Sequence, residues 1–216
     1  KYLKNPPKQL LEMLDFCREM YHASEGAFDI TVGGILHSQG YGSRKMASKV
    51  LSNFWDEVKY NRDEIRIPAE AVIDTGGYGK GWLIDELVDL LAAHGYKNVI
   101  VNGGGDLRIA NDEPVEFSLE HPYDTNKKIG TTHIQNGALA VSSAAKRTWK
   151  HDGKTYHHIV DPKSEASLKN DVVATYVEAP TALLADTLAT ICMIRPDLAK
   201  DLEHQYAARI GILRDI

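Results

Sequence analysis

Apolar residues recur with helical spacing in several parts of the 216-residue chain. In the segment 7–24 they stand three or four positions apart and stop before a glycine, so this pattern predicts a helix. Residues 82–95 carry a broad apolar stripe that ends at Gly95, the residue type that commonly closes a helix. Three further helices are predicted: 45–54, the apolar run ALLADTLATICMI that Pro180 and Thr181 open, and 196–206.

Short runs of alternating or β-branched residues lie between these helices and predict strands. They cover 64–67, 71–74, the residues on both sides of Gly103–Gly105, 115–119, 129–134, 138–142, 155–160, 171–178 and 209–213. The segment 27–44 contains four glycines and is interpreted as a loop that lines a ligand. Helices and hairpin-linked strands occur in mixed order, which indicates an α+β fold with mixed or antiparallel sheets and packed helices rather than a doubly wound sheet.

Composition and charge narrow the classes of function. Hydrophobic residues make up 43% and charged residues 25% of the chain, as in an ordinary globular protein, and a single domain over residues 1–216 is expected. The net charge is -5 and the sequence has no block of Lys and Arg, so nucleic acid is not an expected partner. Cys17 and Cys192 are too few for a disulfide framework, and no apolar run is long enough to span a membrane.

Two glycine turns follow predicted strands and bring charged residues to the strand ends. The first runs from Asp74 through TGGYG to Lys80 and Gly81 at the entrance of a predicted helix, and the second is Asn102–Asp106. Glycines let a backbone approach a ligand closely, and a helix N-terminus attracts anions. Each turn taken alone is equally compatible with a tight structural turn and with a phosphate or metal loop.

Two further polar features stand out from their surroundings. His157 and His158 are adjacent on a predicted strand, so at most one of them faces a given site. Asp186 and Thr190 are four residues apart in an apolar helix and share one face. A buried carboxylate needs a partner, which could be an Arg or a hard cation such as Mg²⁺, unless Asp186 is exposed.

The chain contains in this order the segments GAFDITVGGI (26–35), IDTGGYGKGWLID (73–85), VNGGGD (101–106), AVSSAAKRTW (140–149), GKTYHHIVDP (153–162) and APTALLADTLAT (179–190). In order and spacing these segments resemble the ApbE-like FAD:protein FMN transferases over about residues 10 to 200. The resemblance implies a T-fold-related architecture. It also implies a Mg²⁺-dependent transfer of FMN from FAD to a threonine hydroxyl of an acceptor protein, with release of AMP.

The resemblance also implies roles for individual residues. FAD would be contacted by Ala27, Phe28, Asp29, Asp74, Lys80 and Val160. Mg²⁺ would be held by the carbonyl oxygen of Gly77 together with Asp186 and Thr190. His158 is expected near the reacting phosphate as the general base, with Asp186 as the alternative catalytic residue.

The chain departs from the family pattern at several places, among them Gly34, which replaces the Pro expected after Val-Gly. The early Met-Gly-Thr strand has no counterpart, so the chain is expected to be a fragment or a processed form. Lys163-Ser164-Glu165 replaces Thr-Gly after Asp-Pro, and Ser142-Ser143-Ala144-Ala145-Lys146 replaces Thr-Ser-Gly-Asp-Tyr. Two alternatives therefore stay open: an FAD pyrophosphatase that forms FMN and AMP, and a non-catalytic FAD-binding protein.

The resemblance further implies a location outside the cytoplasm, with a membrane tether outside this sequence. The sequence itself contains no such signal. The oligomeric state and the identity of the acceptor protein are open at this point.

Overall fold

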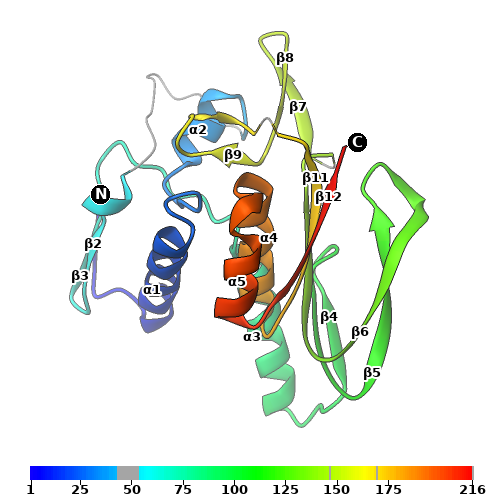
Figure 1. The fold of residues 1–216 in the computed structure, drawn as a ribbon. Coiled ribbons are helices and arrows are strands. Elements are labelled where there is room, and N and C mark those ends of the chain that lie inside the picture. Colours follow the sequence, from blue (N-terminus) through cyan, green and yellow to red (C-terminus); the bar gives the residue numbers. More distant parts are fainter. Residues whose placement is uncertain (43–53, 146, 169, 216) are drawn as a thin grey trace. The chain divides into compact units, whose positions relative to one another are not determined.

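The computed structural model describes residues 1–42, 54–145, 147–168 and 170–215 (Figure 1). The chain divides into two compact units, and each is described by itself. Unit 1 comprises Lys1–Thr75 and Arg147–Lys169. Unit 2 comprises Gly76–Lys146 and Asn170–Ile216.

Unit 2 is built on a five-stranded antiparallel sheet. Its strands are β4 (Val99–Asn102), β5 (Leu107–His121), β6 (Asp124–Ser143), β11 (Val172–Ala179) and β12 (Arg209–Arg214). They lie in the order β12-β11-β6-β5-β4, and β5 and β6 form a long hairpin, drawn in green in Figure 1. More buried and more exposed side chains alternate along β4 and along most of β5, whereas nearly all side chains of β11 are buried, and Leu107, Ile109, Ile134 and Leu139 form a buried cluster. Such alternation is typical of a sheet that is covered on one face.

Two helices of unit 2 cover this sheet and meet each other. Helix α4 (Ala182–Ile194) packs against β6 and β11, and α3 (Gly79–Ala93) packs against α4, β4 and β5. Because α4 is apolar around nearly its whole circumference, its burial is expected. The 3-10 helix η2 (Pro196–Leu198) and α5 (Ala199–Tyr206) follow α4 and lead into β12.

Unit 1 combines helices with small antiparallel sheets. Its elements are β1 (Tyr2–Lys4), α1 (Lys8–Ala23), α2 (Gly33–Ser38), η1 (Trp55–Glu57), β2 (Lys59–Tyr60), β3 (Glu64–Arg66), β7 (Thr148–His151), β8 (Lys154–His157), β9 (Val160–Asp161) and β10 (Ala166–Ser167). Strands β1, β3 and β2 form one sheet, β7 pairs with β8, and β9 pairs with β10. Ile35, Leu36 and Val160 form a buried cluster that ties α2 to β9.

The observed elements confirm the α+β class and most of the predicted helices. The predicted helix 45–54 lies outside the described residues except for Phe54. The loop prediction for 27–44 is wrong at Gly33–Ser38, which form α2, because the apolar residues of this segment pack against β9. The strand predicted at 71–74 is also wrong, since Val72 forms only an isolated bridge with Val32.

The sequence predicted three separate strands at 115–119, 129–134 and 138–142, but the structure has two longer strands, because 129–134 and 138–142 both belong to β6. Strand β5 continues from Leu107 to His121, and β6 continues from Asp124 to Ser143. Polar residues inside these strands interrupt the alternation of apolar and polar positions in the sequence. The strands continue across these residues because their backbones pair with each other in the hairpin. In the described part of the chain, no helix is long and apolar enough to cross a membrane.

Candidate functional site

The first turn of α3 touches the first turn of α4 in unit 2. Gly81 lies so close to α4 that a Cβ atom at this position would stand 2.3 Å from the carbonyl oxygen of Ala182. A side chain therefore does not fit there. The glycine of the sequence motif thus allows two helix starts to approach each other, which brings their polar side chains together.

Three charged residues meet at this approach. The ammonium group of Lys80 forms an ion pair with Asp106 and a second one with Asp186, whose Oδ1 lies 3.3 Å from Nζ. Asp186 also accepts a hydrogen bond from the backbone N–H of Gly81 at 3.2 Å. Asp106 accepts one from the N–H of Val141, likewise at 3.2 Å. The partner that the sequence required for Asp186 is therefore a lysine and a helix N-terminus.

Burial and mutual charge set the electrostatics of this cluster. Asp106 and Asp186 are only 2% and 3% exposed. Burial raises the pKa of Asp186 to about 6, because desolvation outweighs the attraction of Lys80. Burial alone would lower the pKa of Lys80, but Asp186 and Asp106 outweigh it, so this pKa is raised. The cluster thus holds two carboxylates against one ammonium group, an arrangement that favours an additional cation.

Thr190 and the turn that contains Gly77 carry oxygen donors whose chemistry fits a hard cation. Thr190 lies one turn further along α4, where its hydroxyl donates to the carbonyl oxygen of Asp186 at 3.2 Å. Gly77 is half-buried in the turn that leads into α3. Carboxylate, hydroxyl and carbonyl oxygens are ligands that Mg²⁺ accepts together with substrate phosphates. No group of three or more His, Cys, Asp or Glu among the described residues could hold a metal by itself.

Asp85 and Asp106 are parts of this region to which the sequence analysis gave no role. Asp106 belongs to the second glycine turn, in which Asn102 Oδ1 accepts from the N–H groups of Gly104 and Gly105 at 2.9 Å. Asp85, on α3, accepts from the N–H groups of Ala182 and Leu183 and so holds the start of α4. The glycine turn at the end of VNGGGD (101–106) indicated that Asp106 lies at a strand end. No feature of the sequence around Asp85 indicated its contact with α4.

The other predicted residues lie in unit 1. Asp29 is 5% exposed and accepts from both the N–H and the hydroxyl group of Thr31 at 2.7 Å. The N–H of Asp74 donates to the carbonyl oxygen of Ile30 at 2.8 Å, so Asp74 lies beside the segment that follows Ala27 and Phe28.

Val160 and His158 complete the predicted residues of unit 1. Val160 belongs to the cluster with Ile35 and Leu36. His158 is half-buried and stands between β8 and β9. The structure therefore places Ala27, Phe28, Asp29, Asp74, His158 and Val160 in unit 1, and Gly77, Lys80, Asp186 and Thr190 in unit 2.

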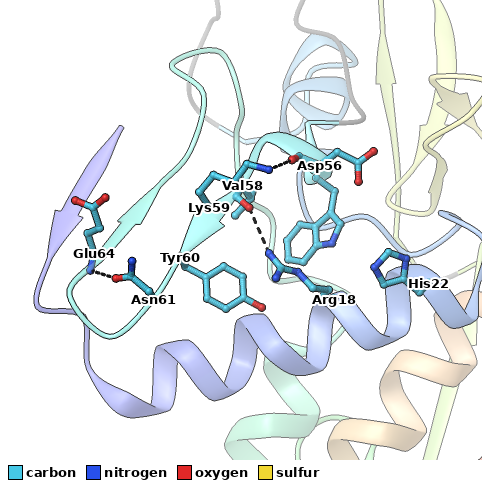
Figure 2. Close-up of a pocket in the computed structure, with 9 residues that line it drawn as sticks. Arg18, His22, Asp56, Val58, Lys59, Tyr60, Asn61 and Glu64 are labelled. Atoms are coloured by element: carbon cyan, nitrogen blue, oxygen red, sulfur yellow. Dashed lines mark hydrogen bonds between the residues drawn. The ribbon is translucent and has the colours of Figure 1, made fainter.

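Figure 2 shows a cavity of about 390 Å³ in unit 1 that none of the predicted site residues lines. Its walls are Arg18, His22, Trp55, Asp56, Val58, Lys59, Tyr60, Asn61 and Glu64. The guanidinium of Arg18 lies over the ring of Tyr60, 4.3 Å from its centroid, and donates to the carbonyl oxygen of Val58 at 3.3 Å. These contacts tie α1 to β2 and to Val58, the residue between η1 and β2.

The fold and the Lys80 cluster define an α+β protein with a buried, charged cluster at two helix starts. The sequence pattern of the ApbE family matches residues 3–210, and the chain belongs to this family.

The chain matches several named relatives, and each match covers only part of the relative's own length. A FAD:protein FMN transferase of Treponema pallidum is 31% identical over 56% of this chain and 37% of its own length. One of Vibrio cholerae is 27% identical over 79% of this chain and 56% of its own, and one of Escherichia coli K12 is 25% identical over 88% and 60%. The chain therefore spans between about a third and three fifths of these relatives.

Solved structures confirm the fold. The ApbE protein of Thermotoga maritima superposes with a TM-score of 0.87 at 20% identity, over 100% of this chain and 78% of the other. The flavin transferase ApbE of Vibrio cholerae gives a TM-score of 0.81 at 22% identity, over 97% of this chain and 72% of the other. The predicted ApbE-like α+β architecture is thus correct.

Proposed function

We propose that the chain transfers FMN from FAD to a threonine hydroxyl of an acceptor protein, with Mg²⁺ as cofactor and AMP as the second product. The observation that carries the proposal is the buried cluster of Lys80, Asp106 and Asp186 at the starts of α3 and α4. The names of the relatives from Treponema pallidum, Vibrio cholerae and Escherichia coli support flavin transfer in this family. By family likeness we also propose that the reaction takes place outside the cytoplasm.

The proposed reaction is a phosphoryl-group substitution. The threonine oxygen attacks the FMN-side phosphorus of FAD, the bond from this phosphorus to the bridging oxygen breaks, and AMP leaves with that oxygen. We assign the hydroxyl proton to His158 as general base. Lys80 adds positive charge for the phosphoryl oxygens, and Asp186 serves as a metal ligand rather than as the base.

Further residues would hold the cofactor and the substrate. Mg²⁺ would be held by Asp186, Thr190 and the carbonyl oxygen of Gly77, and it would supply neutralising charge at the pyrophosphate. FAD would be contacted by Ala27, Phe28, Asp29, Asp74, Lys80 and Val160. Because phosphoryl transfer needs positioning and charge neutralisation more than covalent help from the protein, this residue set is sufficient for the chemistry.

Mass spectrometry tests the proposal directly. The chain is incubated with FAD, Mg²⁺ and a threonine-containing acceptor protein, and the acceptor is expected to gain the mass of an FMN group while AMP appears. Asp186→Ala should lower the rate about a hundredfold or more, because it removes the carboxylate ligand. Asp171→Ala is the matched control, since Asp171 is an exposed acid of the same unit that pairs with Arg214.

Two outcomes would replace the proposal. FMN and AMP without an adduct would make the protein an FAD pyrophosphatase, in which water takes the place of threonine. Bound but unchanged FAD would make it a flavin-binding protein. Equal rates for Asp186→Ala and Asp171→Ala would remove Asp186 from the reaction even if an adduct forms.

A further inference from the structure

Lys80 stands between two buried carboxylates that differ in their contact with its ammonium group. Asp106 is held by its ion pair with Lys80 and by the N–H of Val141. Asp186 receives the ammonium at 3.3 Å and the N–H of Gly81 at 3.2 Å, both long for hydrogen bonds to a charged group. Asp106 receives its backbone N–H at the same 3.2 Å, so the two carboxylates differ in their distance from the ammonium, which lies closer to Asp106. The contact of Lys80 with Asp186 is therefore the more easily replaced.

Lys80 is also able to move. Its side chain is 37% exposed, and a lysine carries its charge on a flexible four-carbon stem. If a cation takes the place of the ammonium on Asp186, the ammonium keeps its ion pair with Asp106, so neither buried carboxylate loses its counter-ion. Lys80 neutralises Asp106 whether or not its ammonium also contacts Asp186.

A divalent cation on Asp186 would meet the ammonium of Lys80 at short range. Two positive charges a few ångströms apart repel each other strongly in a buried setting. Cation and ammonium therefore cannot both occupy the carboxylate of Asp186, whereas Asp106 offers the ammonium an alternative place.

We infer that Lys80 is the resident counter-ion of Asp186, that a divalent cation displaces it from Asp186, and that Asp106 retains the displaced ammonium. The inference rests on the proposed metal site at Asp186 and adds an exchange that sets the affinity of this site. Lys80 thus competes with the metal, and Asp106 is a positioning residue that favours metal binding through Lys80.

Binding of Mn²⁺ to the chain without FAD, read by electron paramagnetic resonance, tests the exchange. Mn²⁺ suits the same oxygen donors as Mg²⁺. Lys80→Met should bind Mn²⁺ about fivefold or more tightly than the unmodified chain, and Asp106→Asn should bind it about fivefold or more weakly. Asp186→Asn should lose the binding. Asp171→Asn, a distant acid of the same unit, should leave the affinity unchanged.

The double variant Lys80→Met/Asp106→Asn separates exchange from simple attraction between Asp106 and the metal. If Asp106 acts through Lys80, Asp106→Asn weakens binding much less in the Lys80→Met background than in the unmodified chain. Equal effects in both backgrounds overturn the inference. If Lys80→Met alone fails to fold, the double variant, which removes one charge of each sign, is compared with Asp106→Asn, and it should bind Mn²⁺ more tightly than Asp106→Asn does.

The remaining outcomes are also decisive. Weaker or unchanged Mn²⁺ binding by a folded Lys80→Met overturns the exchange, and so does the absence of Mn²⁺ binding to every variant. FMN transfer is measured separately on the same preparations. If the chain transfers FMN but the effects of Lys80→Met and Asp106→Asn on Mn²⁺ binding are additive, only the exchange is overturned. If the exchange is observed but no FMN adduct forms, only the proposed function is overturned.

Discussion

At the scale of single residues, Gly81 determines how closely the two halves of the charged cluster come together. Its missing side chain lets α3 approach the carbonyl oxygen of Ala182, and its N–H reaches Asp186. Lys80, the preceding residue, then reaches both Asp106 and Asp186. A glycine in the first turn of a helix lowers helix propensity, so its presence here reflects packing rather than helix formation.

The substitution Gly81→Ala should lower the free energy of unfolding by about 2 kcal/mol or more, because backbone atoms of α4 must shift to admit the methyl group. Urea titration followed by circular dichroism measures the change. Gly130→Ala is the control, since a Cβ there would stand 3.8 Å from Leu119, and its effect should stay within about 1 kcal/mol. Equal effects of the two substitutions would show that α3 and α4 are not in close contact at Gly81.

The sequence predicted part of this cluster. Asp186 stood out because a carboxylate in an apolar helix requires a partner, and Lys80 because it follows a glycine turn. Their ion pair joins residues that are 106 positions apart, and no local pattern encodes which cation crosses that distance. Asp106 joins the cluster only because β5 starts beside β6 in the sheet, which the sequence pattern does not specify.

At the scale of elements, the start of α4 depends on a neighbouring helix. Thr181 caps α4 from within, with its hydroxyl accepting from the N–H of Leu184 at 3.2 Å. Asp85 on α3 accepts from the N–H groups of Ala182 and Leu183 at 2.9 and 2.8 Å, and it also pairs with Arg108. The first turn of a helix has unsatisfied N–H groups, so Asp85 both caps α4 and fixes it to α3.

Asp85→Ala should therefore destabilise the protein more than Thr181→Ala. The first change removes two charge-assisted hydrogen bonds and should cost about 2 kcal/mol or more, whereas the loss of the Thr181 cap should cost about 1 kcal/mol. Thermal unfolding of both variants gives the comparison. Asp85→Asn, which keeps one acceptor oxygen, should lie between them, and equal melting temperatures for all three would argue against the bridging role of Asp85.

Elements with a regular apolar period were predicted well, and those shaped by tertiary contacts were not. Helices α1, α3 and α4 begin and end within a few residues of the predicted limits, because their stripes and end signals are local. Helix α2 was missed since its two glycines suggested a loop, although Ile35 and Leu36 anchor it against Val160. The continuous length of β5 and β6 comes from their mutual pairing, which no window of the sequence displays.

At the scale of the whole molecule, the match to the family and the superposition of the fold cover nearly the entire chain, whereas the proposed activity depends on a few residues. The ApbE pattern covers residues 3–210, and solved ApbE structures superpose on 97 to 100% of the chain. The residues proposed for FAD lie mainly in unit 1, and those proposed for Mg²⁺ lie in unit 2.

FAD and Mg²⁺ together should raise the melting temperature of the chain, because ligands that bind only the folded state stabilise it by mass action. At concentrations about 100-fold above the dissociation constant the gain is about 2.7 kcal/mol, which corresponds to roughly 5 to 10 °C for a chain of this size. Differential scanning calorimetry measures this shift with each ligand alone and with both.

The variant Asp186→Ala isolates the contribution of the metal to this shift. It should keep the part of the shift that FAD produces alone and lose the increment that Mg²⁺ adds, and a chelator should remove the same increment from the unmodified chain. Asp171→Asn, whose carboxylate pairs with Arg214 at the surface, should behave like the unmodified chain. An undiminished Mg²⁺ increment in Asp186→Ala would place the metal elsewhere in the molecule, and the proposed ligand set would then have to be abandoned.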